Sequence, residues 1–464
     1  MRDLPFAPES KIAIVGAGPA GIHMSYELKK RGFKNVVIYE KSARVGGKTY
    51  SQIRDGVNHE LGTTGFAMAK ESPLERLIFD VFPNPDKYTY KIDNMALSKN
   101  ALIKRTKRTR KFGTIIKTLK VLFYRQKFNR IYADLVKKGY PFNIDKDDKD
   151  TLNLLSISMK SFLLSHNLDL IYRSLKSRFT AYGYGKMESI PAFYGLMLMK
   201  ENYLSKTNYR IFKKGNDFLW RETIAKFDLD VELGATISGI DYSKYEQHKK
   251  VSLKIEKNGN EKWEAFDFAI LTTPYTLSQF LPCSVSSVFK DAHSIKYIAS
   301  LVEMGKRDNS ESFYTGEFPA ASIDSYDHDV VLAANFGKIR EASTDGNKSD
   351  SKIFVCFQLN DQKESQLKQN EVTQKLENQI KTLFDRKAGL NQVFKSHTWE
   401  NYCPSFPMKS IESGVIQHIE AEQGKHGLWY TGSCMSGELV SLVLDYNDHL
   451  LNRLSEYHCA KNTH

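Results

Sequence analysis

The sequence predicts an α/β fold that begins with a parallel, nucleotide-binding sheet, and two features of residues 11–40 predict it. The first is an apolar strand at 11–15 that runs into Gly16, Gly18 and Gly21, spaced as G-x-G-x-x-G. The second is an apolar strand at 36–39 that ends on Glu40, 19 residues after Gly21. This order is typical of a Rossmann-like unit, in which a dinucleotide pyrophosphate sits at a helix N-terminus and the acid accepts hydrogen bonds from a ribose hydroxyl.

Hydrophobic patterns predict the elements that follow. Residues 73–205 have mostly helical patterns, broken near 139–141 and 182–185. A strand-rich block covers 231–274 and includes a hairpin at Asn258-Gly259, since Asn-Gly supplies the positive φ values of a tight turn. We expect a further strand at 352–357 and helices at 370–384 and 439–454.

The net charge of +13 is concentrated in residues 101–138. This segment holds 13 basic residues against Asp134 alone, which gives it a net charge of +12. Its apolar residues recur at steps of three and four and predict one apolar stripe on a basic helix. The stripe consists of Phe112, Ile115, Ile116, Leu119, Leu122, Phe123, Ile131 and Leu135.

Two interpretations of this helix stay open. Its stripe can pack on the protein while the charges face solvent, or the helix can make peripheral contact with an anionic membrane. Nucleic acid is not expected as a partner, because the chain shows no base-reading module.

The cysteines and the hydropathy indicate a protein of the cytoplasm. Five cysteines without a C-x-x-C pair predict neither a disulfide framework nor a zinc site, and we expect reduced, mostly buried thiols and no metal. No run of about 18 apolar residues is present, so no membrane span is expected. The strand at 11–15 is too short for the apolar core of a signal peptide. The sequence leaves the oligomeric state open.

Residues 40–48 identify the expected dinucleotide through a resemblance. Glu40, Arg44, Gly46, Gly47 and Lys48 resemble the E-x3-R-x-G-G-R stretch of flavoproteins related to glutathione reductase, especially the amine oxidase superfamily. The resemblance implies FAD as cofactor. Lys48 stands where that family usually has Arg, which keeps the charge but loses the guanidinium fork.

Further segments follow the order of that superfamily. They are the E-x-G region at 60–62, a second FAD segment at 231–274 that ends as D-x-x-I-x-T-x-P, and a glycine loop at 427–433, where Ser433 replaces a frequent acid. The resemblance implies these cofactor-binding residues: Gly16, Gly18, Pro19, Ala20, Gly21, Glu40, Lys41, Gly46, Gly47, Lys48, Gly62, Thr63, Thr64, Ile237, Thr273, Gly432 and Ser433.

The same resemblance implies a discontinuous FAD-binding domain formed by residues 1–72, 206–280 and 396–464. Residues 73–205 and 281–395 are expected to form an inserted α+β substrate domain, which carries the helical, basic cap segment 101–138.

The reaction class follows from a motif that occurs once. Flavoproteins that use NAD(P)H carry a separate site for it, and this chain has no second G-x-G-x-x-G. Electrons are therefore expected to come from the substrate. The reduced flavin then returns a hydride to the same substrate, which gives an isomerisation, or passes electrons to O2 or a quinone.

Three stretches, 179–194, 398–404 and 429–445, resemble bacterial FAD-dependent polyenoic fatty acid isomerases. The resemblance implies a double-bond shift in a polyunsaturated fatty acid by hydride transfer to and from flavin N5, with no side-chain acid or base. The expected aromatic wall of a lipid tunnel consists of Phe179, Tyr182, Tyr184, Phe193, Tyr194 and Tyr402. A loose alignment assigns the fatty carboxylate to Lys91, with Lys87 and Arg210 as alternatives.

Two other functions stay open. The first is an FAD-dependent oxidase or desaturase that acts on an amine or another apolar substrate with O2. The second is a non-catalytic flavoprotein that binds lipid. The sequence does not identify the substrate or the electron acceptor.

Overall fold

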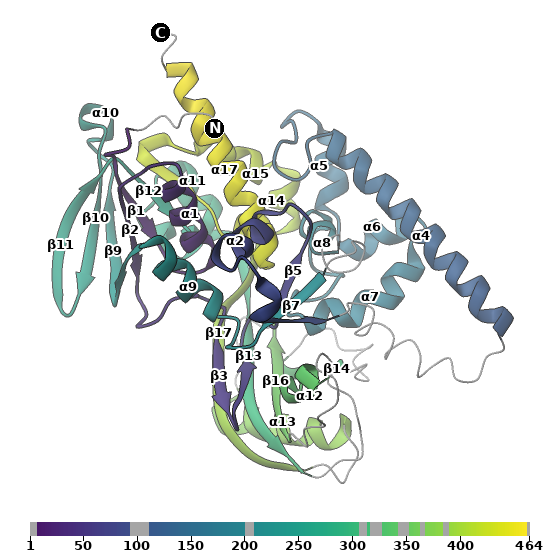
Figure 1. Ribbon diagram of the computed structural model, residues 1–464. Helices are drawn as coiled ribbons and strands as arrows, with labels where there is room; N and C mark the ends of the chain where they lie inside the picture. Colours follow the sequence, from purple (N-terminus) through teal and green to yellow (C-terminus); the bar gives the residue numbers. More distant parts are fainter. Residues whose placement is uncertain are drawn as a thin grey trace.

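The structure is a computed structural model that describes residues 7–92, 111–199, 208–305, 313–315, 327–341, 352–361, 367–383 and 389–461. Within these ranges a parallel sheet, an antiparallel sheet and a helical region lie around a shared centre (Figure 1).

The parallel sheet confirms the predicted Rossmann-like α/β fold. Its strands run in the order β18-β12-β1-β2-β8, and every neighbouring pair is parallel. They come from three separate stretches of the chain: β1 Lys11–Val15, β2 Asn35–Glu40, β8 Asp230–Leu233, β12 Phe268–Leu271 and β18 Leu428–Tyr430. Both faces are buried, as expected for a parallel sheet.

Alternating residues of β1 belong to two hydrophobic clusters. Ile12 and Ile14 pack with the helices α1 Pro19–Lys30, α2 Pro73–Val81, α9 Phe218–Phe227 and α17 Val440–Lys461. Ala13 and Val15 pack with the antiparallel strands β9 Ala235–Asp241 and β10 Val251–Lys257, which continue into β11 Asn260–Phe266. Asn258 and Gly259 form the predicted hairpin turn with φ of 52° and 76°.

The antiparallel sheet has the order β14-β15-β16-β13-β17. Its strands are β13 His293–Met304, β14 Phe313–Thr315, β15 Asp327–Ala334, β16 Ile353–Asn360 and β17 Leu390–Ser405. Helix α13 Gln369–Leu383 packs on one face, where Leu376 and Ile380 meet Val302 and Phe354. Residues of the other face, among them Tyr297 and Phe357, point toward the centre of the molecule.

Short elements connect these layers. The sheet β5 Phe66–Met68, β7 Asn208–Phe212 and β6 Thr89–Ile92 lies between the two large sheets. The strand pair β3 Ser51–Arg54 and β4 Val57–Glu60 lies alongside the antiparallel sheet, where β4 contacts β16. The remaining short helices are η1 Pro85–Lys87, α10 Tyr245–His248, η3 Pro274–Phe280, α11 Cys283–Lys290, α12 Phe336–Glu341, α14 Met408–Glu412, α15 Val415–Glu422, η5 Lys425–Gly427 and α16 Ser433–Ser436.

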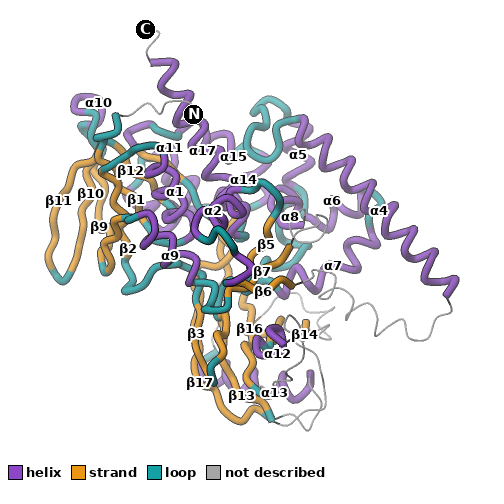
Figure 2. The backbone as a smooth tube through the Cα atoms, viewed as in Figure 1, coloured by secondary structure: helices purple, strands orange, loops and turns teal. Residues whose placement is uncertain are grey.

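The helical region contains α4 Lys111–Lys137, α5 Lys149–Ser156, α6 Met159–Ser165, α7 Asp169–Ala181 and α8 Ala192–Met199. It lies to one side of both sheets, and α4 extends away from the body (Figures 1 and 2). No helix among the described residues is both long and apolar enough to cross a membrane.

Three members of the predicted apolar stripe have described side chains: Leu135 is buried, Ile131 is partly buried and Phe123 is 62% exposed. The stripe as a whole therefore stays a prediction. Phe128, which the stripe did not include, is buried. Positions 123 and 128 are separated by about 140° around a helix, so the two rings lie on different faces. The side chains of 111–122 and all of 101–110, which complete the predicted segment, lie outside the described residues.

This packing predicts that two phenylalanines of the same helix contribute very differently to the free energy of unfolding. Phe128→Ala should lower the free energy of unfolding by about 3 to 4 kcal/mol, because it leaves a cavity under α4. Phe123→Ala should change it by less than about 0.5 kcal/mol, because that ring is already in solvent. Urea unfolding of both variants measures the difference, and equal losses would contradict the described orientation of α4.

Candidate functional site

Two glycine loops that are far apart in the sequence meet at the end of β12. A Cβ on Gly16 would lie 2.4 Å from Thr272 Oγ1, and a Cβ on Gly432 would lie 2.0 Å from the Thr272 carbonyl oxygen. Both glycines have φ above 100°, which other residues rarely adopt. The Thr272 hydroxyl donates to the Val15 carbonyl at 2.7 Å and so ties β12 to β1. Loops from both ends of the chain thus form one backbone surface at the carboxyl edge of the sheet.

A third loop, 44–49, faces the first. A Cβ on Gly47 would lie 2.9 Å from the Gly18 Cα, so backbone meets backbone here. The Arg44 guanidinium shapes this loop by donating to the carbonyls of Gly47 at 2.6 Å and Thr49 at 3.2 Å. Gly18 is the N-cap of α1 and Pro19 its first residue, so the N–H groups at the positive end of α1 start beside this contact.

Glu40 ends β2 next to the glycine turn. Its Oε2 accepts from the Ala17 N–H at 2.8 Å, and its Oε1 accepts from the Ser42 N–H and hydroxyl. A carboxylate has about four lone-pair positions, so Glu40 keeps capacity for a ribose hydroxyl while it braces the turn.

Two buried hydroxyls in this region have no hydrogen-bond partner. They are Ser238 Oγ, which follows Ile237 on β9, and Ser441 Oγ in the first turn of α17. Because an unsatisfied buried hydroxyl costs about 1 to 3 kcal/mol, both fit a site completed by a polar ligand.

An ion pair joins the loop at Lys48 to the N-terminus of α17. Lys48 Nζ lies 2.7 Å from Glu438 Oε1, and Glu438 Oε2 accepts from the Cys403 N–H at 2.9 Å. The Glu438 side chain is only 7% exposed, so the ammonium and the helix N-terminus both stabilise its charge. Lys48 Nζ also lies 5.4 Å from the centre of the Tyr402 ring.

A cleft opens beside this ion pair and is walled by tyrosines. Its lining includes the loop Gly62–Phe66, residues 438–441, Leu332 and five tyrosines: Tyr182, Tyr184, Tyr209, Tyr297 and Tyr402. The cleft therefore lies where the parallel sheet, the antiparallel sheet and the end of α7 meet.

Backbone carbonyls hold the tyrosine rings in place. The Tyr297 hydroxyl donates to the Ala181 carbonyl at 2.7 Å, and the Tyr402 hydroxyl donates to the Tyr182 carbonyl at 3.3 Å. The two rings stack with their centres 4.6 Å apart. Burial raises the pKa of both phenols well above 10, so they stay neutral and do not act as bases near neutral pH.

The structure brings together part of the predicted aromatic wall. Tyr182, Tyr184 and Tyr402 line the cleft. Phe179, Phe193 and Tyr194 are fully buried and lie outside its lining. The Tyr194 hydroxyl instead donates to the Cys434 carbonyl at 2.8 Å and accepts from the Phe406 N–H, which fastens α8 to the loop after Gly432.

Lys91 also lies outside the residues that line the cleft. Its side chain is 58% exposed, and Nζ pairs with Asp86 at 2.7 Å. Arg210, the neighbour of Lys91 across β6 and β7, pairs with the same carboxylate at 2.6 Å. The role of Lys91 as binder of the fatty carboxylate stays a prediction.

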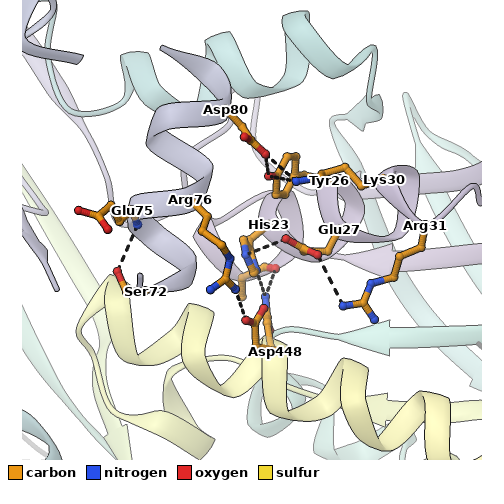
Figure 3. Close-up of polar contacts among 12 residues, drawn as sticks. His23, Tyr26, Glu27, Lys30, Arg31, Ser72, Glu75, Arg76, Asp80 and Asp448 are labelled. Atoms are coloured by element: carbon orange, nitrogen blue, oxygen red, sulfur yellow. Dashed lines mark hydrogen bonds and ion pairs between the residues drawn. The ribbon is translucent and has the colours of Figure 1, made fainter. Parts of the chain in front are cut away.

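A polar cluster that includes His23, Glu27, Arg76 and Asp448 lies where α1, α2 and α17 meet (Figure 3). Its neighbour Asn447 supports the glycine turn. Asn447 donates through Nδ2 to the Ala20 carbonyl at 2.8 Å and accepts through Oδ1 from the Thr431 hydroxyl at 2.6 Å. The same Nδ2 lies 3.3 Å from His23 Nδ1. Asn447 therefore connects the first turn of α1 with the residue before Gly432.

These contacts also fix the tautomer of His23. Since an amide N–H faces Nδ1, that nitrogen accepts and the proton sits on Nε2. Nε2 faces Glu27 at 3.9 Å, and the ligand atoms of His23, Glu27 and Asp448 lie within 4.8 Å of one another. A protonated Nε2 offers no lone pair to a metal ion, so this cluster does not fit one.

Ser238, Asn447 and Glu438 carry no motif of their own and were not predicted, and Tyr209 and Tyr297 were missing from the expected wall. Thr272 is the threonine of the D-x-x-I-x-T-x-P ending but was not predicted as a residue of the site. Arg44 was part of the recognised motif but was not predicted as a residue that shapes the loop.

The comparisons support this description. The family model "NAD(P)-binding Rossmann-like domain" matches residues 14–80. The chain is 28% identical over 209 residues to a polyenoic fatty acid isomerase of Ptilota filicina, and the match spans 42% of this chain and 42% of that relative.

Solved structures share the fold over nearly the whole chain. A fatty acid isomerase from P. acnes that produces CLA matches with a TM-score of 0.72 at 17% identity, over 97% of this chain and 99% of that one. Wild-type putrescine oxidase bound to putrescine matches with a TM-score of 0.57 at 13% identity, over 97% and 99%. The predicted resemblance to fatty acid isomerases and to the amine oxidase fold is confirmed.

The glycine contacts predict a loss of stability for one variant and a loss of bound cofactor for another. Gly21→Ala should destabilise the protein by about 3 kcal/mol or more, since its Cβ would lie 1.9 Å from the Gly16 carbonyl oxygen. Gly18→Ala should fold within about 1 kcal/mol of the parent, since its Cβ lies 3.7 Å from Gly47, but should lose bound dinucleotide because the added methyl group covers backbone at the N-terminus of α1 that a pyrophosphate would approach. Urea unfolding and the cofactor content of the purified proteins separate the effects.

Gly389→Ala is the matched control for both, because nothing lies within 4 Å of its Cβ. A Gly18→Ala protein with full cofactor content would show that the dinucleotide does not lie against Gly18.

The buried His23 predicts an acid-dependent loss of stability. Burial, with Arg76 and Arg31 as smaller causes, lowers its pKa from 6.5 to about 3. Below pH 6.5 the unfolded chain binds a proton that the folded chain rejects, so this stability is present above pH 6.5 and is lost as pH falls toward 3. Between pH 7 and pH 5 the loss should be about 2 kcal/mol.

His23→Asn should remove this contribution, because asparagine can accept at the position of Nδ1 but does not titrate. Urea unfolding of parent and variant at both pH values tests it. Parallel pH profiles of stability for parent and variant would mean that His23 is already protonated in the folded protein at pH 5.

Proposed function

We propose that the protein is an FAD-dependent isomerase that shifts a double bond in a polyunsaturated fatty acid. The observation that carries the proposal is the tyrosine-walled cleft beside the glycine loops, in which the ionisable carboxylate, Glu438, is already paired with Lys48. The similarity to isomerases from two organisms supports it.

The residues present fit FAD. The opposed backbones of Gly18 and Gly47 suit a pyrophosphate, and Glu40 has capacity for a ribose hydroxyl. Ser238 and Ser441 hold unpartnered hydroxyls at two further places, beside Ile237 and in the cleft lining. Thr63, Thr64 and the N-terminus of α17 would hold the flavin ring, and Thr273, Gly432 and Ser433 the chain that leads to it.

The cleft suits a cationic hydrocarbon. Bound FAD would supply a hydride acceptor and donor, so that a bis-allylic hydride can leave one carbon and return to another. The faces of Tyr402 and its neighbours would stabilise the positive charge on the substrate through their quadrupoles. Their neutral, hydrogen-bonded hydroxyls would neither trap the cation nor remove a proton from it.

An oxidase that acts on an amine is the second candidate, favoured by Glu438 and by the fold shared with putrescine oxidase. A carboxylate in a tyrosine-walled cleft attracts an ammonium group. Lys48 cancels that charge at 2.7 Å, and the isomerase is therefore the better-supported function.

The experiment that separates the two functions measures both the deuterium retained in the product and the O2 consumed. Linoleic acid carrying deuterium at its bis-allylic carbon is incubated with the purified protein with and without O2. An isomerase should form a conjugated diene without O2, keep the transferred deuterium in the product and consume no O2. Loss of the label with stoichiometric H2O2 would instead establish the oxidase or desaturase.

The tyrosine wall predicts a graded effect at Tyr402. Tyr402→Leu should lower kcat by roughly 5- to 30-fold, since it removes a ring face worth about 1 to 2 kcal/mol to a desolvated cation. Tyr402→Phe should keep kcat within about twofold, because its hydroxyl makes only a 3.3 Å bond to the Tyr182 carbonyl. Steady-state kinetics on the active substrate checks both, and a larger loss in the Phe variant would assign the catalysis to the hydroxyl.

A further inference from the structure

We propose that α4 docks the protein on an anionic membrane surface. The proposal concerns a surface outside the cleft, so it goes beyond the proposed reaction and can be tested without it.

The charge of α4 fits such a surface. Residues 111–137 contain seven Lys or Arg residues and Asp134 as their acid, a net charge of +6 on one helix. The helix extends from the helical region away from both sheets, so it can approach a flat surface without hindrance from the body (Figure 1). Basic side chains near anionic headgroups contribute about 1 kcal/mol each.

The two faces of the described part of α4 differ in their role. Phe128 and Leu135 lie on one face and are buried. Phe123, Lys127 and Arg130 follow at steps of four and three and therefore share the opposite face, which Asp134 and Lys137 continue. Lys137 Nζ pairs with Asp134 Oδ1 at 3.0 Å, so this face carries a net charge of +2. Phe123 is 62% exposed, Arg130 is exposed, and the Lys137 side chain is 76% exposed.

An exposed aromatic ring among basic residues suits the boundary between headgroups and acyl chains. The ring can enter the apolar region while the cations stay with the phosphates. A second copy of this helix would be repelled by its equal charge, and the sequence shows no base-reading module that would favour nucleic acid. An anionic bilayer satisfies both the charge and the ring.

The position of α4 connects this surface to the cleft. The helix packs against α7, which ends at Ala181 directly before Tyr182 of the cleft wall. If the proposed function is correct, this face would keep the protein at the lipid bilayer, in which a free fatty acid is dissolved.

The test is co-sedimentation of the full chain with phosphatidylcholine vesicles, with and without phosphatidylglycerol. We expect binding only to the anionic vesicles and release at high salt. Lys127→Gln with Arg130→Gln should lower the partition coefficient by about 30-fold, the equivalent of two lost basic contacts. Phe123→Ser should weaken binding while leaving its salt dependence unchanged.

The matched control is Lys244→Gln with Lys290→Gln, which removes the same charge from exposed positions outside α4. Circular dichroism confirms that each variant is folded. Equal binding by the two double variants would overturn the proposal, as would absence of binding to anionic vesicles. Retention on a DNA duplex that alone depends on Lys127 and Arg130 would overturn it in favour of nucleic acid.

Discussion

The close packing of backbone against backbone at the carboxyl edge of the parallel sheet is the constraint on which the site depends. A Cβ added to Gly16 or Gly432 would clash with Thr272, and a Cβ added to Gly47 would clash with Gly18. Segments separated by about 400 residues can meet this closely only where side chains are absent. The end of β1, the start of α1 and the start of α17 consequently take up one fixed arrangement, with both helix N-termini directed at the same region.

This constraint also explains what the sequence could predict. The glycine spacing, the two strands and Glu40 form a local unit, so 30 consecutive residues were enough to identify it. Asn447 donates to the Ala20 carbonyl, 427 residues away in the sequence, and no local pattern marks it. Thr272 is visible as the threonine of D-x-x-I-x-T-x-P, but that motif does not indicate its contacts with Val15 and Gly16. The basic helix shows a related limit: the exposed Phe123 and the buried Phe128 lie on different faces, and a periodic pattern does not say which face meets the protein.

The aromatic wall shows the same limit. Tyr182, Tyr184 and Tyr402 were found because they stand in stretches that resemble isomerases, but the same stretches also contain Phe179 and Phe193, which fill the core. Both groups are aromatic and neither has a spacing that separates a wall from a core. Tyr209 and Tyr297 stand on strands that are buried on both faces around these residues, so burial alone does not indicate a cleft.

Lys48, which replaces the usual arginine, contacts both carboxylate oxygens of Glu438, Oε1 at 2.7 Å and Oε2 at 2.9 Å. Oε2 also accepts from the Cys403 N–H at 2.9 Å. Cys403 has a φ of 47°, a strained value for a residue with a Cβ, and its hydrogen bond to Glu438 helps to hold that turn. Because Tyr402 directly precedes this turn, the position of the cleft wall is coupled to the same loop that faces Gly18.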